Sequence, residues 1–497
     1  MYSPKTNDIR QFYYTPYRME MLCHFAKQYV KMGADAGRMD KVELTIYQTN
    51  DIHSDFEKLA KAAAYIKRTR NAEDLYFDCG DLCDLKDLTV QGTAGKGAIS
   101  LLKQAGATAM AVGNNEIDLE KDGLLECSML GLPMLSCNVV DCEGNPFGAI
   151  AGSMVIKRMG VRFLVIGASP YYGAGCCPDF YNPFFKMGNI MTVEPIARIR
   201  KELEKNKGNY DFCILVSHSG LGIEEMLLKE IPEIDLCLGG HSHSVFCGKN
   251  YVQSGKSGAY IGVVHLTIEG GKVMGMTTEL VENNAMPDEG VQKLWEDWKK
   301  KAEELLGETM YTVEAMAWDA KKENFLTNFI ADALYEEYPC DFAFINAGIV
   351  EDGIEGAVSK KRLLELSPSK LNPTRFPVKG SALKEAILHS LDGEFVSQSG
   401  QGSGVRGKIL GTLGFSHNVK IQQSPFAVWV DDKPLEDERS YDCVADDALQ
   451  RGTGYLELAV PDEQAEFYRG FIRDLLERTL QNQKLWETAG RRRVYET

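Results

Sequence analysis

Short apolar runs alternate with longer amphipathic segments over the first half of the chain. The runs lie between Val42 and about Asn284 and read VELTIYQ, DLYFDCG, TAMAVG, FLVIGA, DFCILVS, IDLCLGG and AYIGVVHLTI. Runs of this length predict buried strands, and the segments between them predict helices. Alternating strands and helices are typical of an α/β domain whose sheet is largely buried.

A charged segment with apolar residues at helical spacing follows from Asp288 to Leu306 and predicts a connecting helix. A second region then begins with the helical ENFLTNFIADALYEEY, continues through the strand DFAFIN and a glycine-rich stretch at Ser397–Gly414, and closes with charged helices. We therefore expect four parts: an extension over residues 1–41 with a helix around Tyr17–Met32, an α/β domain over 42–287, a connecting helix over 288–312, and a second domain over 313–497.

Polar motifs directly follow five of the predicted strands. In chain order they read TNDIHSD, CGDLCD, GNNEID, SHSG and GGHSHS. They contribute the candidate site residues Asp51, His53, Asp81, Asn114, Asn115, Asp118, His218, His241 and His243. Because the carboxyl ends of strands in an open α/β sheet meet at one edge, we expect these side chains to lie close together. Carboxylates, an amide and neutral histidines in one cluster are typical of a site for metal cations.

Each motif has a simpler interpretation when it is taken alone. A single D-x-H or G-G-H is often a turn with a structural histidine, and Asp81 after a glycine could cap a helix. The metal site is favoured by the occurrence of all five motifs in this order, each after an apolar run. The D-x-H and H-x-H spacings also allow residues two apart on an extended segment to reach neighbouring positions of one site.

These motifs resemble those of the calcineurin-like metallophosphoesterases, in which T-N-D-x-H, G-D-x-x-D, G-N-x-E, S-H-x-G and G-G-H-x-H occur in this order. The second region narrows the resemblance to the 5′-nucleotidase/UDP-sugar hydrolase branch, and the resemblance covers about Val42 to Asp462. It implies an N-terminal four-layer α/β/β/α metallophosphoesterase domain followed by a 5′-nucleotidase C-terminal α/β domain.

The resemblance also implies a set of metal ligands. One metal would be held by Asp51, His53 and His243, the other by Asn114, His218 and His241, and Asp81 would bridge the two. Two cations about 3.5–4 Å apart polarise a phosphoryl oxygen and activate a water for attack on phosphorus. The nitrogen and oxygen ligands suit manganese, zinc, iron or cobalt, and ligand type alone does not choose among them.

One position departs from the family. The family has Gly-Asn-His-Glu where this chain has Gly113-Asn114-Asn115-Glu116, and Asp118 matches the aspartate that supports the family's catalytic histidine. Asn115 donates a hydrogen bond but carries neither a proton nor a positive charge. Loss of general-acid help costs about 10²- to 10⁴-fold in rate. The alternatives are an enzyme whose substrate has a good leaving group, a slow enzyme, or a non-catalytic sensor that binds metal and nucleotide.

The second domain supplies the candidate substrate-binding positions. By the resemblance, polar contacts come from the strand and loop DFAFINAG, and two aromatic rings clamp a nucleobase. The matching residues are Asn346, Gly348, Tyr455 and, for the second ring, either Phe395 or Phe415. A base stacked on aromatic rings gains about 1–3 kcal/mol per stacking partner.

Three departures weaken the nucleotide assignment, and one of them is a glycine-rich stretch that is longer than the resemblance leads us to expect. The loop after Asn346 contains Glu351 and Asp352 where the family has an arginine, and Thr453 replaces an acidic residue of the family's last motif. An acidic loop repels a phosphate, so a non-nucleotide phosphoester stays an alternative to nucleoside monophosphates, UDP-sugars, cyclic nucleotides and dinucleoside polyphosphates.

Composition and charge narrow the class of partner. The net charge of −16 argues against nucleic acid or an anionic membrane as the main partner, and favours a phosphorylated small molecule bound through metal. No apolar stretch reaches the roughly 18 to 20 residues that span a bilayer. The first residues lack the pattern of a secretory signal. Together with thirteen scattered cysteines, this predicts a reduced, cytoplasmic protein.

Overall fold

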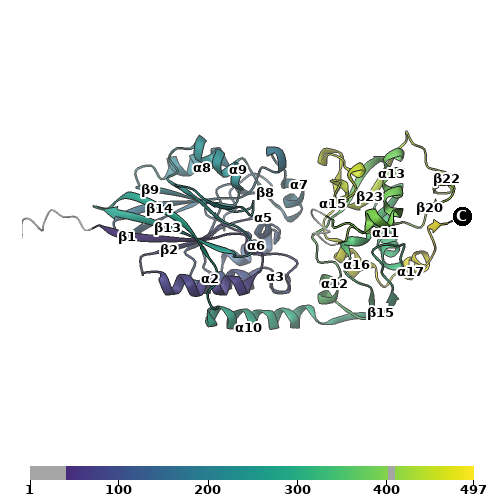
Figure 1. The fold of residues 1–497 in the computed structure, drawn as a ribbon, viewed down its shortest axis with the longest axis horizontal. Helices are drawn as coiled ribbons and strands as arrows, with labels where there is room; N and C mark the ends of the chain where they lie inside the picture. The colour runs from purple at the N-terminus through teal and green to yellow at the C-terminus, as the bar shows by residue number, and fades with distance from the viewer. Residues whose placement is uncertain (1–40, 401–408, 497) are drawn as a thin grey trace, which may run out of the picture.

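Two domains lie side by side along the long axis of the molecule and are joined by helix α10 (Glu289–Leu306) (Figure 1). The computed structural model describes residues 41–400 and 409–496. The predicted extension at residues 1–40, with its helix, and part of the glycine-rich stretch lie outside the described residues. None of the described helices combines the length and apolar character that crossing a bilayer requires.

The first domain contains two six-stranded sheets among its described residues. The first sheet has the order β14-β13-β1-β2-β3-β4, and its strands are β14 (Lys272–Glu282), β13 (Tyr260–Glu269), β1 (Val42–Thr49), β2 (Leu75–Asp78), β3 (Ala109–Ala111) and β4 (Met134–Leu135). Strands β1 to β4 run parallel, whereas β13 and β14 are antiparallel to their neighbours. The apolar run at the start of the domain therefore forms a central strand of this sheet.

The second sheet has the order β11-β12-β10-β9-β7-β6. Its strands are β11 (Val245–Cys247), β12 (Tyr251–Ser254), β10 (Leu236–Leu238), β9 (Phe212–Ser217), β7 (Val161–Ala168) and β6 (Ser153–Arg158). The four strands β12, β10, β9 and β7 run parallel. The carboxyl ends of β9 and β10 therefore point the same way, which places the histidine motifs that follow them together.

The two sheets face each other across a shared apolar layer that includes Ile46, Phe77, Phe163 and Ile214. On the outer face of the first sheet pack the helices α2 (Phe56–Thr69), α3 (Leu88–Thr93), α4 (Lys96–Ala105) and α10. On the outer face of the second sheet pack α8 (Pro195–Lys205) and α9 (Leu221–Glu230). This is the predicted α/β/β/α arrangement, and the fold-class prediction is confirmed.

The second domain is built on a five-stranded sheet with the order β19-β16-β23-β18-β24. Its strands are β19 (Leu413–Phe415), β16 (Phe342–Asn346), β23 (Ser440–Asp446), β18 (Pro373–Lys379) and β24 (Glu466–Phe467). One face is covered by α11 (Phe325–Glu337), α16 (Ile472–Thr479) and α17 (Gln483–Ala489), and the other by α13 (Gly380–Leu391). Strands β15 (Thr309–Met316) and β17 (Ile354–Ser359) form a separate pair after α10.

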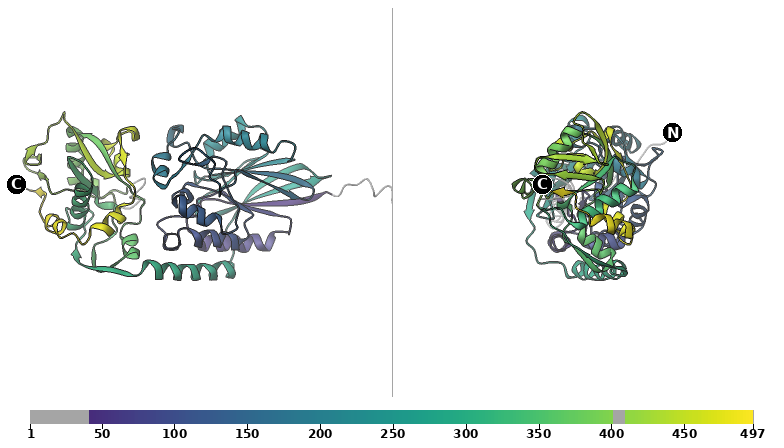
Figure 2. Two further views of the ribbon diagram at one scale, coloured as in Figure 1. Left: turned by 180° about the vertical axis from the view of Figure 1, so that it is seen from behind. Right: turned by 90° about the vertical axis from the view of Figure 1, so that its right-hand side faces the viewer.

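Direct contacts join the two domains beside the carboxyl ends of the first domain's strands. Figure 2 shows the two domains from behind and from one end. Arg469 of the second domain pairs with Glu120 of the first, with Nη2 2.5 Å from Oε2. Arg473 Nη2 donates to Gln91 Oε1 at 3.1 Å. The guanidinium of Arg451 lies 4.6 Å from the ring centroid of Phe184. These contacts bring the second domain against the edge that carries the polar motifs.

The end of the chain is attached through a buried ion pair. Arg493 Nη2 lies 2.7 Å from Asp332 Oδ2, and both side chains are almost fully buried. Arg493→Met should lower the free energy of unfolding by about 3–5 kcal/mol, because it leaves a buried carboxylate without its cation. Urea unfolding of the intact chain, followed by circular dichroism, measures this change.

The matched control is Lys484→Met, which removes an exposed ion pair to Glu336 in the same domain. That substitution should cost less than about 1 kcal/mol. Equal effects of the two substitutions would contradict a structural role for the buried pair.

Candidate metal centre

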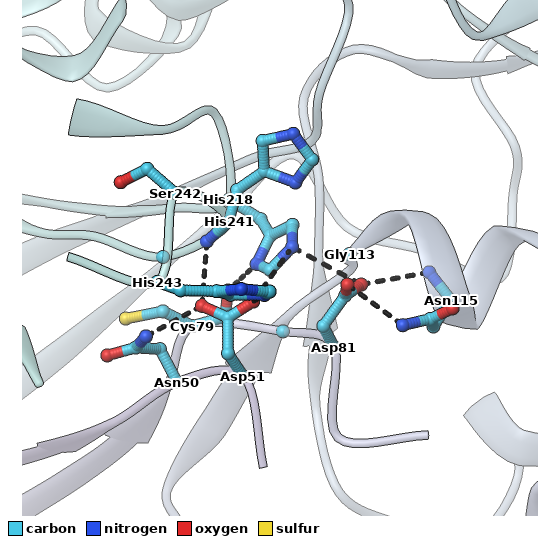
Figure 3. Close-up of polar contacts among 12 residues, drawn as sticks. Asn50, Asp51, Cys79, Asp81, Gly113, Asn115, His218, His241, Ser242 and His243 are labelled. Carbon is cyan, nitrogen blue, oxygen red and sulfur yellow. Dashed lines mark hydrogen bonds and ion pairs between the residues drawn. The ribbon is translucent and has the colours of Figure 1, made fainter. Parts of the chain in front are cut away.

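The predicted site residues lie in loops that begin where the strands end. Asp51 and His53 follow β1, Asp81 follows β2, Asn114 follows β3, His218 follows β9, and His241 and His243 follow β10. The structure therefore brings together side chains separated by almost two hundred residues in the sequence (Figure 3).

Five of these residues have left-handed backbone conformations. Their φ angles are 50° at Asp51, 48° at His53, 53° at Asp81, 75° at His241 and 55° at His243. This conformation costs an L-residue about 1–2 kcal/mol and is found mainly where function requires it. The tight loops turn the side chains inward to one point.

The loop after β3 approaches the others closely because it contains a glycine. A Cβ atom at Gly113 would lie 2.3 Å from Asp81 Oδ1, far inside van der Waals contact. Only glycine allows this approach, which explains the glycine that precedes Asn114 in the motif.

Two groups of potential metal ligands form within the cluster. Asp51, His53 and His243 form the first, and Asp81, His218 and His241 form the second, each with its ligand atoms within 4.8 Å of one another. In the first group, Asp51 Oδ1 lies 3.3 Å from His243 Nε2. The Nε2 atoms of His53 and His243 lie 3.0 Å apart.

Asp81 lies between the two groups. Its Oδ1 is 3.2 Å from His218 Nε2, and its Oδ2 is 3.9 Å from His53 Nε2. Each carboxylate oxygen therefore faces a different group, so Asp81 is placed where it could serve both.

Three buried atoms of the cluster have no hydrogen-bond partner among the described residues: Asp51 Oδ1, Asn114 Oδ1 and His218 Nε2. The other polar atom of Asp51, Oδ2, accepts from the backbone nitrogen of His241 at 2.7 Å. His218 Nδ1 donates to the carbonyl of Cys79 at 2.7 Å. Each of these two side chains is thus oriented by a hydrogen bond on one atom, while its other atom points into the cluster and makes no hydrogen bond. A buried orphan acceptor is costly unless a cation binds it, so these residues fit metal.

The pKa values of the clustered carboxylates and of His218 also indicate that a cation fits here. Burial would raise the pKa of Asp51 and of Asp81, but the neighbouring histidines outweigh burial and hold both well below the usual range. Burial would lower the pKa of His218, but Asp81 and Asp51 outweigh it and raise this pKa to about 10. The buried carboxylates therefore favour a positive charge beside them. A bound metal ion would supply that charge in place of a proton on a histidine.

Two buried glutamates hold the ligand loops in place. Glu116 accepts hydrogen bonds from the backbone nitrogens of Asp81, at 2.8 Å, and Gly113, at 2.9 Å. Glu224 accepts from the backbone nitrogens of Ser219, at 3.0 Å, and Gly240, at 3.3 Å. Sequence analysis missed Glu224, because it lies on α9 outside every motif and its role depends on the folded loops.

The two predicted catalytic positions lie beside the second group. Asn115 donates from its backbone nitrogen to Asp81 Oδ1 and from Nδ2 to Asp81 Oδ2, both at 2.9 Å. Its Oδ1 accepts from Lys370 Nζ at 2.6 Å, and Lys370 also forms an ion pair with Asp118. Lys370 belongs to the second domain and lies in no recognisable motif, so only the three-dimensional contact reveals it.

Comparison with known families identifies both domains. Residues 44–245 match the calcineurin-like phosphoesterase family, and residues 308–459 match the 5′-nucleotidase C-terminal domain. The chain belongs to the 5′-nucleotidase branch of the calcineurin-like metallophosphoesterases. The predicted family is confirmed, and its members are phosphoric ester hydrolases.

Individual relatives resemble this metallophosphoesterase over most of their length. An uncharacterized metallophosphoesterase of Bacillus subtilis, YunD, is 26% identical over 469 residues, which cover 88% of this chain and 98% of that protein. A 5′-nucleotidase of Bos taurus is 24% identical over 435 residues, covering 72% and 74%.

Solved structures share the fold at lower identity. The 5′-nucleotidase precursor from Thermus thermophilus superposes with a TM-score of 0.54 at 19% identity, covering 92% of this chain and 97% of that one. The NAD nucleotidase of Haemophilus influenzae gives 0.59 at 15% identity, covering 92% and 98%. Both superpositions cover the two domains together.

The polar substrate-binding candidates lie at the end of β16. Asn346 Oδ1 accepts from the backbone nitrogen of Gly348. A Cβ atom at Gly348 would lie 2.2 Å from the carbonyl oxygen of Leu410, so this position requires glycine. Neither residue contacts the metal ligands in this arrangement of the metallophosphoesterase.

The aromatic candidates do not form an open clamp. Phe415 is 2% exposed and packs against Phe344 in the core, with ring centroids 6.1 Å apart, so its ring is not open to a stacking partner in this structure. Tyr455 is fully buried and donates to the Gly411 carbonyl at 2.7 Å. Phe395 stacks on His389 at 4.5 Å and contacts Tyr455 at 5.4 Å. The rings of Phe395 and Tyr455 contact each other, so this pair does not hold a base between them in this structure.

Metal binding should stabilise this enzyme. Addition of Mn²⁺ or Zn²⁺ to metal-stripped protein, at a hundred times the dissociation constant, should raise the free energy of unfolding by about 2.7 kcal/mol per site. The cause is the pairing of orphaned buried atoms in the folded state alone. Thermal unfolding with and without metal measures the gain.

His218→Ala should reduce this gain, because it removes a fully buried ligand. The control is His265→Ala, which removes a partly exposed histidine that pairs with Glu279 on the same domain. An unchanged gain in His218→Ala would rule out the assigned ligands.

Proposed function

We propose that this metallophosphoesterase hydrolyses phosphoric monoesters of small molecules with two divalent cations. Asp51, His53 and His243 would hold one cation, Asn114, His218 and His241 the other, and Asp81 would bridge them. When bound, the cations supply Lewis acidity to a phosphoryl oxygen and lower the pKa of water near neutrality.

The observation that carries the proposal is the orientation of the unpaired ligand atoms. Asp51 and His218 are each held by a hydrogen bond on one polar atom, and the other atom is buried, makes no hydrogen bond and faces another side chain of the cluster at 3.3 Å and 3.2 Å. Ligands fixed in this way keep a site in its working geometry before metal arrives. The protein's contribution is thus preorganisation of charge, and no protein nucleophile is needed.

A small substrate is supported by a cavity between the domains. The cavity has a volume of about 290 Å³, and its lining includes Asp118, Glu120, Phe184, Asn372, Arg469 and Phe471. Asp118 is the catalytic candidate that lines this cavity, and Arg469 lines it in an ion pair with Glu120. A phosphorylated molecule held there would extend from the catalytic edge towards the second domain.

Nucleotides are the leading substrate class, because relatives such as the Bos taurus protein are named 5′-nucleotidases. A second candidate is a phosphoester without a nucleobase. It is favoured by the contact between Phe395 and Tyr455 and by the burial of Phe415, which leave no formed aromatic clamp.

The assay is phosphate release from a panel of nucleotides and simple phosphate esters, with Mn²⁺, Zn²⁺ or Co²⁺ restored to stripped protein. His218→Ala should lower kcat/KM by at least about 100-fold, since even partners of metal ligands are worth 10–100-fold. His265→Ala should retain activity. The best substrate of the panel decides between the nucleotide and the base-free phosphoester.

Elemental analysis of the same samples should give two metal ions per chain. Tight binding of two ions with no turnover on any substrate would replace the hydrolase with a non-catalytic sensor. Turnover that persists in stripped protein would overturn the metal-dependent mechanism.

A further inference from the structure

A lysine of the second domain reaches the catalytic edge of the first. Lys370 lies in the loop between α12 (Lys360–Leu366) and β18, and its ammonium contacts Asn115 Oδ1 at 2.6 Å and the carboxylate of Asp118. The Lys370 and Asp118 side chains are only 19% and 22% exposed. Because an ammonium has three donors and two are used here, one is left for a third partner.

This ammonium is one side chain away from the candidate bridging ligand. Asn115 accepts from Lys370 and donates to both oxygens of Asp81, at 2.9 Å each. Burial would lower the pKa of Lys370, but the carboxylate of Asp118 outweighs burial and raises it. Lys370 therefore keeps its charge beside the reacting position.

A positive charge beside Asn115 would help the reaction. Asn115 stands where the resembled family has histidine, and an amide cannot carry the positive charge that the departing oxygen requires. Asp118, the partner of that missing histidine, is instead paired with Lys370. The ammonium and its carboxylate thus occupy the place of an imidazolium and its carboxylate.

We infer that Lys370 is a catalytic residue that places its ammonium on the leaving-group oxygen of the phosphate ester. In the reaction, the water oxygen forms a bond to phosphorus while the bond from phosphorus to the ester oxygen breaks. The bonding electron pair leaves on that ester oxygen, and the N–H donor of Lys370 stabilises the charge there. The attacking water loses one proton and the departing ester oxygen gains one, so the protons balance and the products are inorganic phosphate and the free alcohol.

This inference rests on the proposed hydrolase function and adds a role for the second domain. In the arrangement of the structure, the ammonium reaches Asn115 while Arg469 pairs with Glu120 across the same domain interface. The catalytic site is therefore shared by both domains, and separation of the domains would remove the leaving-group donor while the metal ligands stay intact.

The test compares Lys370→Met and Lys370→Arg with Lys361→Met, which removes a lysine that pairs with Glu303 of α10 away from the site. Each variant is assayed as full-length, metal-loaded protein on 4-nitrophenyl phosphate and on phenyl phosphate, whose phenol has a pKa of about 10. Manganese binding by calorimetry is the second readout.

Lys370→Met should lower kcat on phenyl phosphate by at least about 100-fold, and clearly less on 4-nitrophenyl phosphate, because a good leaving group needs little help. Manganese affinity should not change, since Lys370 contacts no candidate ligand. Lys370→Arg should retain more activity than Lys370→Met. Asn115→His in the Lys370→Met background should recover part of the rate on phenyl phosphate.

Equal losses on the two substrates, or a parallel loss of manganese affinity, would assign Lys370 a structural role and overturn the inference. Full activity of Lys370→Met on both esters would overturn it as well, while the proposed hydrolase would stand. Absence of phosphate release by the unaltered protein would overturn the hydrolase, and the inference with it.

Discussion

Buried carboxylates and imidazoles meet in this protein where the strand ends of two packed sheets come together, and their charges have to be balanced there. Asp51 and Asp81 are almost completely buried, and the fully buried His218 lies 3.2 Å from Asp81. The unpaired atoms in this cluster cost free energy in the folded state unless cations bind them. The left-handed loops, the glycine at position 113 and the supporting glutamates all serve to hold this arrangement.

Much of the fold and of the candidate site could be predicted from sequence, because both depend on local pattern. The run VELTIYQ alternates with helical segments as a buried strand does, and it forms β1. The candidate ligands Asp51, His53 and His218 immediately follow such strands, which could be predicted, but β1 and β9 belong to different sheets and it is the packing of the two sheets that brings these residues together. The motifs are short loops directly after strands, so their few residues determine the local backbone conformation and can be recognised in the sequence.

The rest depends on contacts that local sequence does not encode. Phe415 lies near the expected position of a stacking residue, yet it belongs to a short strand and its ring packs in the core against Phe344. Glu224 and Lys370 belong to no motif, and each acquires its role through partners far away in the chain. The replacement of the family's histidine by Asn115 is visible in the sequence. The contact between Asn115 and Lys370 of the second domain is visible only in the folded structure.

Anomalous X-ray diffraction from crystals soaked in Mn²⁺, recorded on both sides of the manganese absorption edge, tests the central claim most directly. The account predicts two manganese peaks, one beside Asp51, His53 and His243 and the other beside Asn114, His218 and His241, with Asp81 in contact with both. A single peak, or peaks away from these residues, would contradict a centre in which two cations balance the buried carboxylates.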